Sequence, residues 1–148
     1  MNYGAVMSWP QISAAEAARA LRDTGAVYLD VRTLEEFELG HVLGAYHVPW
    51  LIAGEPNAEF TSIVLGAFGR EQSLIVGCQS GQRSGPACAA LLSAGAAHVS
   101  EQHGGYGGKR DAFGRVVEAG WERAGLPVAT HALPGHSYRD LRALALGS

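Results

Sequence analysis

The sequence predicts one α/β domain with a mainly parallel β-sheet, and two observations carry this prediction. Short apolar runs of strand length alternate along the chain with segments of helical periodicity. This alternating order is typical of parallel strands that are joined by helical crossovers. The chain also has 148 residues, of which 47% are hydrophobic. That length and composition suit a single domain with a buried core and exclude a disordered chain.

Two capping boxes predict the starts of two helices. The stretches SAAE at 13–16 and TLEE at 33–36 each place a hydroxyl and a carboxylate three residues apart. In this motif each side chain satisfies a backbone N–H of the first helical turn. We therefore expect a helix over residues 13–24, ended by Gly25, and a short second helix that Gly40 ends.

The remaining elements follow from apolar periodicity and from the residues that flank each run. We expect strands at residues 26–31, 45–48, 73–77 and 96–100. We expect further helices at residues 57–68, 84–94 and 138–146. The glycine-rich stretch HGGYGGKRDAFG, residues 103–114, is expected to be a loop.

Composition and charge restrict the classes of function. The formal net charge of −3 argues against binding to nucleic acid or to an anionic membrane, because both usually need an excess of basic residues. The sequence shows no signal-peptide pattern and no long apolar run, so we expect a cytoplasmic protein without a membrane span. Two cysteines, Cys78 and Cys88, are too few for a disulfide framework and suit a reducing compartment.

The stretch CQSGQRSGP, residues 78–86, is the strongest functional signal. It follows the apolar run SLIVG and precedes a predicted helix, so Cys78 is expected at the carboxyl end of a parallel strand, where ligands bind in open α/β sheets. Gly81 permits a tight turn, and the loop amides and the helix N-terminus can then converge on an anion. With Arg83 as the one cation in the loop, the site is expected to supply a nucleophilic thiolate near neutral pH.

The size of this loop favours sulfur transfer over phosphoryl transfer. Four residues separate Cys78 from Arg83, whereas phosphatases with a Cys-x5-Arg loop have five. A smaller ring of amides suits one added sulfur atom better than a tetrahedral phosphoryl group. Two alternatives remain open at this point: a Cys-dependent phosphatase or arsenate reductase, and a non-catalytic module that binds a protein partner.

Four stretches of the chain closely resemble the rhodanese, or thiosulfate sulfurtransferase, family. LDVRTLEEFELGHVLGAYHVPW resembles the D-V-R and G-H-[IV]-x-G-A motifs, and LIVGCQSGQRSGPACAALLSAG resembles the active-site strand, loop and helix. The glycine pair at 104–105 and the W…AGLPV pattern at 121–128 resemble the closing motif. Together these stretches span about residues 10–128, which is most of the chain.

The resemblance implies a rhodanese-like fold with a central five-stranded, mainly parallel sheet flanked by helices. It implies a domain over residues 1–128 and leaves 129–148 as a partly helical tail. It implies that Cys78 forms a persulfide during transfer from a small-molecule sulfur donor to a thiol or cyanide, with a sulfur-relay protein as a candidate partner and with no cofactor or metal. The loop residues that would bind substrate are Gln79, Ser80, Gly81, Gln82, Arg83 and Ser84, with Arg83 as an anion contact or a brace. The supporting positions are Asp30, Arg32, Glu36 and His41.

For several other residues we expect structural rather than catalytic roles. We expect Asp30 and Arg32 to form a buried or half-buried ion pair, and His41 to make a structural hydrogen bond. Cys88 falls on the apolar face of its predicted helix and is expected in the core. Four other histidines show no metal-ligand spacing: His98, His103, His131 and His136.

One departure from the family pattern concerns the closing motif. The family tryptophan usually follows the glycine pair by about four residues, but Trp121 lies sixteen residues after Gly105. The extra residues, about 106–120, read as an insertion. Because the segment after a late parallel strand starts at the carboxyl edge of the sheet, we expect the insertion near the mouth of the active site. Its basic residues, Lys109, Arg110 and Arg115, could draw anions to Cys78 or simply solvate a loop.

Overall fold

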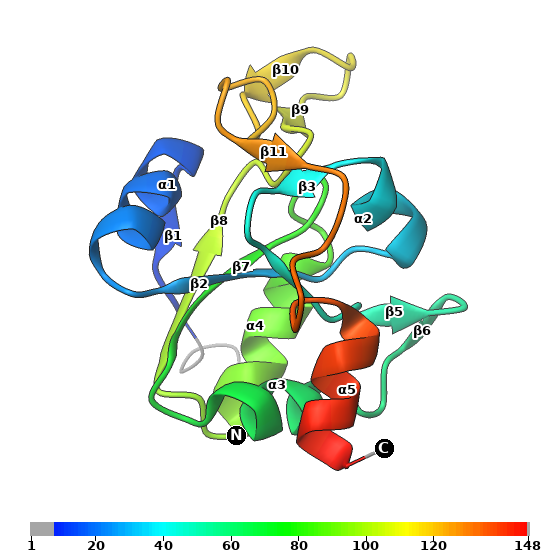
Figure 1. Ribbon diagram of the computed structural model, residues 1–148. Helices are drawn as coiled ribbons and strands as arrows, with labels where there is room; N and C mark the ends of the chain where they lie inside the picture. Colours follow the sequence, from blue (N-terminus) through cyan, green and yellow to red (C-terminus); the bar gives the residue numbers. More distant parts are fainter. Residues whose placement is uncertain (1–7, 148) are drawn as a thin grey trace, which may run out of the picture.

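Five parallel strands form the central sheet of the protein, which is known from a computed structural model that describes residues 8–147 (Figure 1). The strand order is β1-β8-β7-β2-β4, and every pairing between neighbours is parallel. The strands are β1 (Gln11–Ile12), β8 (His98–Gln102), β7 (Ser73–Gly77), β2 (Val27–Asp30) and β4 (Tyr46–His47). The predicted α/β class is confirmed, and the sheet is wholly rather than mainly parallel.

Five helices and three small antiparallel pairs complete the described chain. The helices are α1 (Ala14–Asp23), α2 (Leu34–Leu39), α3 (Phe60–Phe68), α4 (Ser84–Ser93) and α5 (Tyr138–Leu146). The small pairs are β3 (His41–Val42) with β11 (Val128–Ala129), β5 (Leu51–Ile52) with β6 (Glu55–Pro56), and β9 (Lys109–Arg110) with β10 (Val116–Glu118). Both predicted capping boxes are present, with reciprocal hydrogen bonds at α1 and α2.

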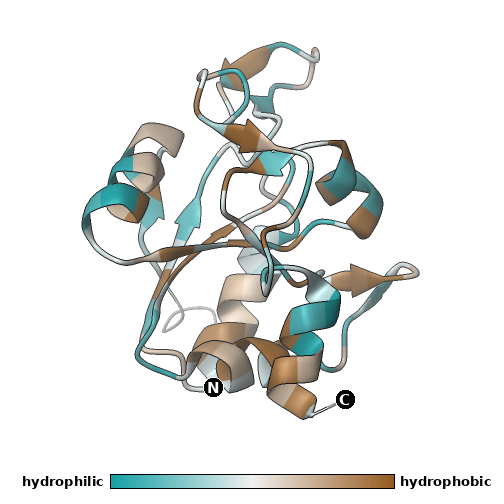
Figure 2. Cartoon of the chain, in the orientation of Figure 1, coloured by the Kyte–Doolittle hydropathy of each residue, from teal (hydrophilic) through white to brown (hydrophobic). Residues whose placement is uncertain are grey.

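Alternation along the strands divides the core into two clusters, one on each face of the sheet. Leu29 and Val76 lie in the cluster that includes residues of α3, α4 and α5. Tyr28 and Ile75, their neighbours in the chain, lie in the cluster that includes residues of α1 and α2. Figure 2 shows the hydrophobic colour along β2, β7 and α3, as expected for strands that are covered on both faces.

The C-terminal segment packs on helix α3. Leu141 of α5 is buried, and Arg142 pairs with Glu59 just before α3, with 2.9 Å between Nε and Oε1. A Cβ atom added to Gly66 would lie 2.9 Å from the Cβ of Ala145, so the two helices approach closely. The helix predicted at 138–146 is therefore present. It covers part of the main core, which is the cluster that includes Leu29 and Val76.

Some details differ from the sequence predictions. The residue patterns do not predict β1, because a two-residue edge strand carries no detectable alternation. Strand β8 begins at His98, two residues later than predicted. The predicted glycine loop, 103–114, contains β9, which pairs with β10 just beyond the loop. Residues 1–7 of the predicted domain and residue 148 of the predicted tail lie outside the described residues. Within residues 8–147, no helix is long and apolar enough to cross a membrane.

Candidate active site

Cys78 directly follows strand β7, at the carboxyl edge of the sheet, and its side chain is only 1% exposed. Gly77, the last residue of the strand, must be glycine for a steric reason. A Cβ atom at Gly77 would lie 1.8 Å from the hydroxyl oxygen of Tyr28, which donates a hydrogen bond to Gln102 Oε1 at 2.5 Å. The Tyr28 side chain therefore occupies the space where any other residue at position 77 would place its side chain, and the strand brings Cys78 to the edge beside it.

The sulfur of Cys78 has two polar partners. The backbone N–H of Gly81 donates to Sγ at 3.0 Å, and Sγ lies 3.4 Å from Ser84 Oγ. Gly81 has φ +106°, a conformation that L side chains rarely adopt, so glycine is needed for this turn. Helix α4 begins at Ser84 and directs its N-terminal partial positive charge toward the loop. This arrangement favours negative charge on the sulfur.

Ser84 links the cysteine to a buried carboxylate that the sequence analysis missed. The Ser84 hydroxyl donates to Glu101 Oε2, and the indole Nε1 of Trp9 donates to Glu101 Oε1 at 2.8 Å. Glu101 is 5% exposed and belongs to strand β8. Glu101 lies one residue beyond the strand predicted at 96–100, and no pattern in the sequence points to it.

Arg83 forms an ion pair with Glu36, which lies in the first turn of helix α2. Its two terminal nitrogens donate to the two carboxylate oxygens at 2.6 and 2.9 Å. The hydrogen bond from Arg83 is the largest cause that lowers the pKa of Glu36, to about 2. The same hydrogen bond raises the pKa of Arg83 above its usual value. Of the two roles that the resemblance leaves open for Arg83, this geometry is that of a brace for the loop.

Arg32 and Asp30 form the buried ion pair that the sequence predicts, with 2.8 Å between Arg32 Nη2 and Asp30 Oδ2. Arg32 also donates to the carbonyl of Gly40 at 2.7 Å and to Gln79 Oε1 at 3.1 Å, and its guanidinium lies 4.5 Å from the ring centroid of Tyr106. Every part of the buried cation therefore has a partner, as a buried charge requires. The pair anchors the first residue after Cys78.

His41 has the structural hydrogen bond that the sequence predicts. Its Nδ1 lies 2.7 Å from the carbonyl oxygen of Phe37, and its ring stacks on the Phe37 ring at 3.6 Å between centroids. These contacts hold the turn after α2. Cys88 is fully buried in the main core, as predicted, and its pKa is raised by burial first and then by the charges of Glu101 and Cys78.

The glycine-rich segment after β8 docks directly on the cysteine loop. The N–H of Tyr106 donates to the carbonyl of Cys78 at 2.7 Å, and the N–H of Gly107 donates to that of Gln79 at 2.9 Å. A Cβ atom at Gly105 would lie 2.3 Å from the Cys78 carbonyl oxygen. Glycine at 105 is thus required for the two backbones to approach.

The insertion leaves and re-enters the fold at nearly one point. The N–H of Trp121 donates to the carbonyl of Gly105 at 2.9 Å, and its indole packs edge-on against Tyr28 at 5.7 Å between centroids. The extra residues between them project outward as the β9–β10 hairpin (Figure 1). The buried tryptophan therefore lies at the end of the closing segment in spite of the longer spacing.

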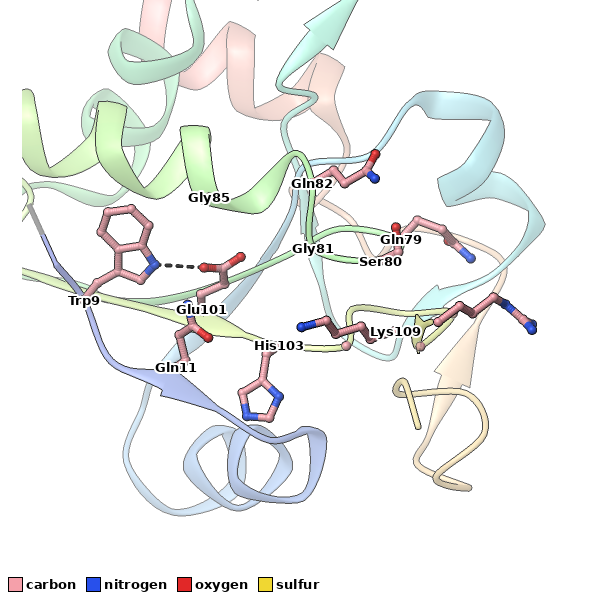
Figure 3. A pocket seen from close by; sticks show the side chains of 14 residues that line it. Trp9, Gln11, Gln79, Ser80, Gly81, Gln82, Gly85, Glu101, His103 and Lys109 are labelled. Atoms are coloured by element: carbon pink, nitrogen blue, oxygen red, sulfur yellow. Dashed lines mark hydrogen bonds between the residues drawn. The ribbon is translucent and has the colours of Figure 1, made fainter. Parts of the chain in front are cut away.

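A cavity of about 780 Å³ lies between the cysteine loop, the end of β8 and the insertion (Figure 3). Gly81 and its loop neighbours at 79, 80 and 82 line one side, and Glu101, His103, Lys109 and Arg110 are among the other lining residues. The insertion thus contributes Lys109 and Arg110 to a cavity that the cysteine loop also lines. Arg115 does not line this cavity; it pairs with Asp111 at 3.3 Å. Among residues 8–147, no group of three potential metal ligands is placed to hold a metal ion.

The protein has a parallel β-sheet with helices on both faces, and Cys78 lies in a loop at the carboxyl end of the central strand β7. These two features define a class of α/β proteins whose site is a loop centred on a cysteine. The profile of the family described as "Rhodanese-like domain" matches residues 13–110, and the chain belongs to this family. The family resemblance drawn from the sequence is therefore confirmed.

Relatives with known names share much of this chain. Thiosulfate sulfurtransferase 16, chloroplastic, of Arabidopsis thaliana is 38% identical over 123 residues, which cover 80% of this chain and 92% of that protein. Protein HIGH ARSENIC CONTENT 1, mitochondrial, of the same plant is 38% identical over 99 residues, which cover 64% of this chain and 59% of that protein. Among solved structures, Rv0390 from M. tuberculosis has a TM-score of 0.72 and 29% identity, covering 84% of this chain and all of that one.

Proposed function

We propose that this protein is a sulfurtransferase that carries a sulfane sulfur on Cys78 from thiosulfate or a related anionic donor to a thiol or to cyanide. The observation that carries the proposal is the position of the Cys78 sulfur, which lies 3.0 Å from the Gly81 amide and near the N-terminus of α4. Such a setting stabilises a thiolate and the persulfide anion that replaces it.

The proposed reaction has two displacement steps. The Cys78 thiolate attacks the sulfane sulfur of thiosulfate, the donor S–S bond breaks, and sulfite leaves with the bonding electron pair. The enzyme then holds a persulfide anion. An acceptor such as cyanide attacks the terminal sulfur, thiocyanate forms, and the Cys78 thiolate returns with the electron pair of the broken bond.

The donor anion would be held without a free arginine in the loop. Arg83 is neutralised by Glu36, so the loop amides and the end of α4 are the proposed contacts for the donor. Lys109 and Arg110 line the adjoining cavity and would raise the local concentration of anions. A sulfur-relay protein as acceptor and a cytoplasmic location stay predictions.

Two other functions are open to the same site. A phosphatase or arsenate reductase would use the same nucleophile, and the name of one relative refers to arsenic, so phosphate esters and arsenate belong in the assay. The four-residue spacing between Cys78 and Arg83 argues against a phosphoryl group. A non-catalytic module would fold in the same way but would acquire no sulfur.

The test is the intact mass of the protein after incubation with thiosulfate. The wild type should gain the mass of one sulfur atom, and cyanide should remove it with release of thiocyanate. Cys78→Ser should show neither change, whereas Cys88→Ser, which alters only the core cysteine, should show both. Sulfur loading that persists in Cys78→Ser, or turnover of arsenate or phosphate esters without sulfur loading, would contradict the proposal.

A further inference from the structure

Glu101 is the one acidic side chain joined to the nucleophile by hydrogen bonds within residues 8–147. The connection runs from Cys78 Sγ to Ser84 Oγ and from Ser84 Oγ to Glu101 Oε2. All three residues are buried, with exposed fractions of 1%, 0% and 5%. The proposed transfer reaction gives this carboxylate no role, although a buried charge is costly to keep.

The direction of these hydrogen bonds corresponds to one distribution of protons among Cys78, Ser84 and Glu101. A serine hydroxyl has one hydrogen, and that of Ser84 is donated to Glu101. In this direction Ser84 accepts from Cys78, and Cys78 supplies the S–H. In that direction the set has a thiol at Cys78 and an ionised carboxylate at Glu101; in the reverse direction it has a thiolate and a carboxylic acid, and both carry one negative charge.

We propose that Glu101 is a positioning residue that shares one proton with Cys78 through the hydroxyl of Ser84, and that its charge restrains ionisation of the nucleophile. This inference rests on the proposed role of Cys78 as nucleophile.

When Cys78 ionises by this route, two hydrogens move, each to the next side chain along the connection. The sulfur proton passes to Ser84 Oγ, and the hydroxyl hydrogen of Ser84 passes to Glu101 Oε2, so that the set of three side chains keeps one negative charge. Ser84 then donates to the thiolate, and the carboxylic acid of Glu101 donates to Ser84. Loss of a further proton would leave two negative charges close together in a buried site, which their repulsion opposes.

The neighbours of Glu101 are a hydrogen-bond donor and the basic side chains of the adjoining cavity. Trp9 donates to its second oxygen, and Lys109, Arg110 and His103 line the cavity that Glu101 also lines (Figure 3). The other titratable neighbour, Cys88 of α4, is a buried thiol whose pKa is raised, in part by Glu101. Because Glu101 reaches the cavity and the sulfur is buried, the carboxyl group offers a path for proton exchange with solvent.

The experiment measures alkylation of Cys78 by iodoacetamide between about pH 6 and about pH 9, in a Cys88→Ser background so that one thiol reacts. Glu101→Gln keeps the shape, accepts from Trp9 and donates to Ser84, but carries no charge. It should alkylate at least about fivefold faster than the parent at neutral pH, with a difference that shrinks as pH rises. A slower rate would make Glu101 a general base, and an unchanged rate would make it a structural link; either result would overturn the inference.

A double-mutant cycle tests the route through Ser84. In a Ser84→Ala background, Glu101→Gln should change the rate by less than about twofold, because the hydroxyl that couples the two groups is gone. Ser84→Thr, which keeps a hydroxyl, should restore the larger effect. An undiminished effect of Glu101→Gln in Ser84→Ala would show that the charge acts without Ser84 and would refute the coupling.

A second variant covers the case in which Glu101→Gln does not fold. Trp9→Phe leaves Glu101 in place but removes a hydrogen bond to its carboxylate, so it should also speed alkylation; no change in rate would overturn the inference. Alkylation needs no sulfur donor. A failure to load sulfur would therefore overturn the proposed function without affecting this test.

Discussion

Arg83 and Glu36 form an ion pair with two hydrogen bonds, which ties the cysteine loop to the first turn of helix α2. Glu36 is also the carboxylate of the capping box at Thr33, so one side chain serves both the helix start and the loop. The pair is partly exposed, with side-chain exposures of 22% for Arg83 and 30% for Glu36. The two-pronged geometry of this pair is suited to holding the loop in one position.

If Arg83 braces the loop, its removal and that of its partner should have the same effect. We expect Arg83→Ala and Glu36→Ala each to lower kcat/KM for thiosulfate about tenfold, equivalent to about 1.4 kcal/mol. The double variant should be little worse than either single one, because both remove one interaction. Arg83→Lys should recover only part, because a point charge lacks the planar fork. The measurement is steady-state kinetics of the four variants and the wild type.

A different result would assign Arg83 to the substrate. If Arg83→Ala raises KM strongly while Glu36→Ala does not, the guanidinium must leave Glu36 and contact the donor during turnover.

The pKa of Glu36 predicts how stability depends on pH. Arg83 lowers this pKa from 4.5 to about 2 in the folded protein, so the unfolded chain binds more protons between these values. The stabilisation is therefore present above about pH 4.5 and is lost as pH falls toward 2. In urea unfolding, Glu36→Gln should be less stable than wild type at pH 7 and should lose less stability on acidification. Parallel curves for the two proteins would contradict the assignment.

The close approach of Gly105 to the cysteine loop predicts a sharp local effect. Gly105 has φ +59°, and its added Cβ would meet the Cys78 carbonyl oxygen at 2.3 Å, a backbone atom that no rotamer change can move. Gly105→Ala should therefore lower the free energy of unfolding by about 3 kcal/mol or prevent folding. Gly25→Ala is the matched control, since its φ is +76° but nothing lies within 4 Å. It should cost only about 1–2 kcal/mol, from backbone strain alone.

Lys109 and Arg110 should contribute to donor capture by their charge. Neutralising both to Gln should lower kcat/KM for thiosulfate about threefold or more at low ionic strength, with a smaller effect at high salt. Arg115→Gln is the control, because this residue belongs to the same insertion but pairs with Asp111 away from the cavity. Equal effects of the cavity pair and of Arg115, or no dependence on salt, would mean that the hairpin does not steer the donor.

Much of the fold and the centre of the site could be predicted from the sequence, because their signals are local. The capping boxes at α1 and α2 each involve residues only three apart. The strand, Cys78 and the following helix are consecutive, so their order alone places the sulfur at the carboxyl edge of a parallel sheet. The Asp30–Arg32 pair spans two residues, and the apolar periodicity of α4 buries Cys88.

Only the tertiary structure decided which distant groups complete the site. Arg83 meets Glu36 across 47 positions of the chain, Ser84 meets Glu101 across 17, and Trp9 meets Glu101 across 92. No periodicity or motif records such pairings, because they depend on how the layers pack on the sheet. The same holds for β1, whose two residues become a strand only through hydrogen bonds to β8. The position of Cys78 is thus determined by neighbouring residues in the chain, whereas the groups that brace its loop and the proposed proton partner Glu101 are brought together by the parallel sheet.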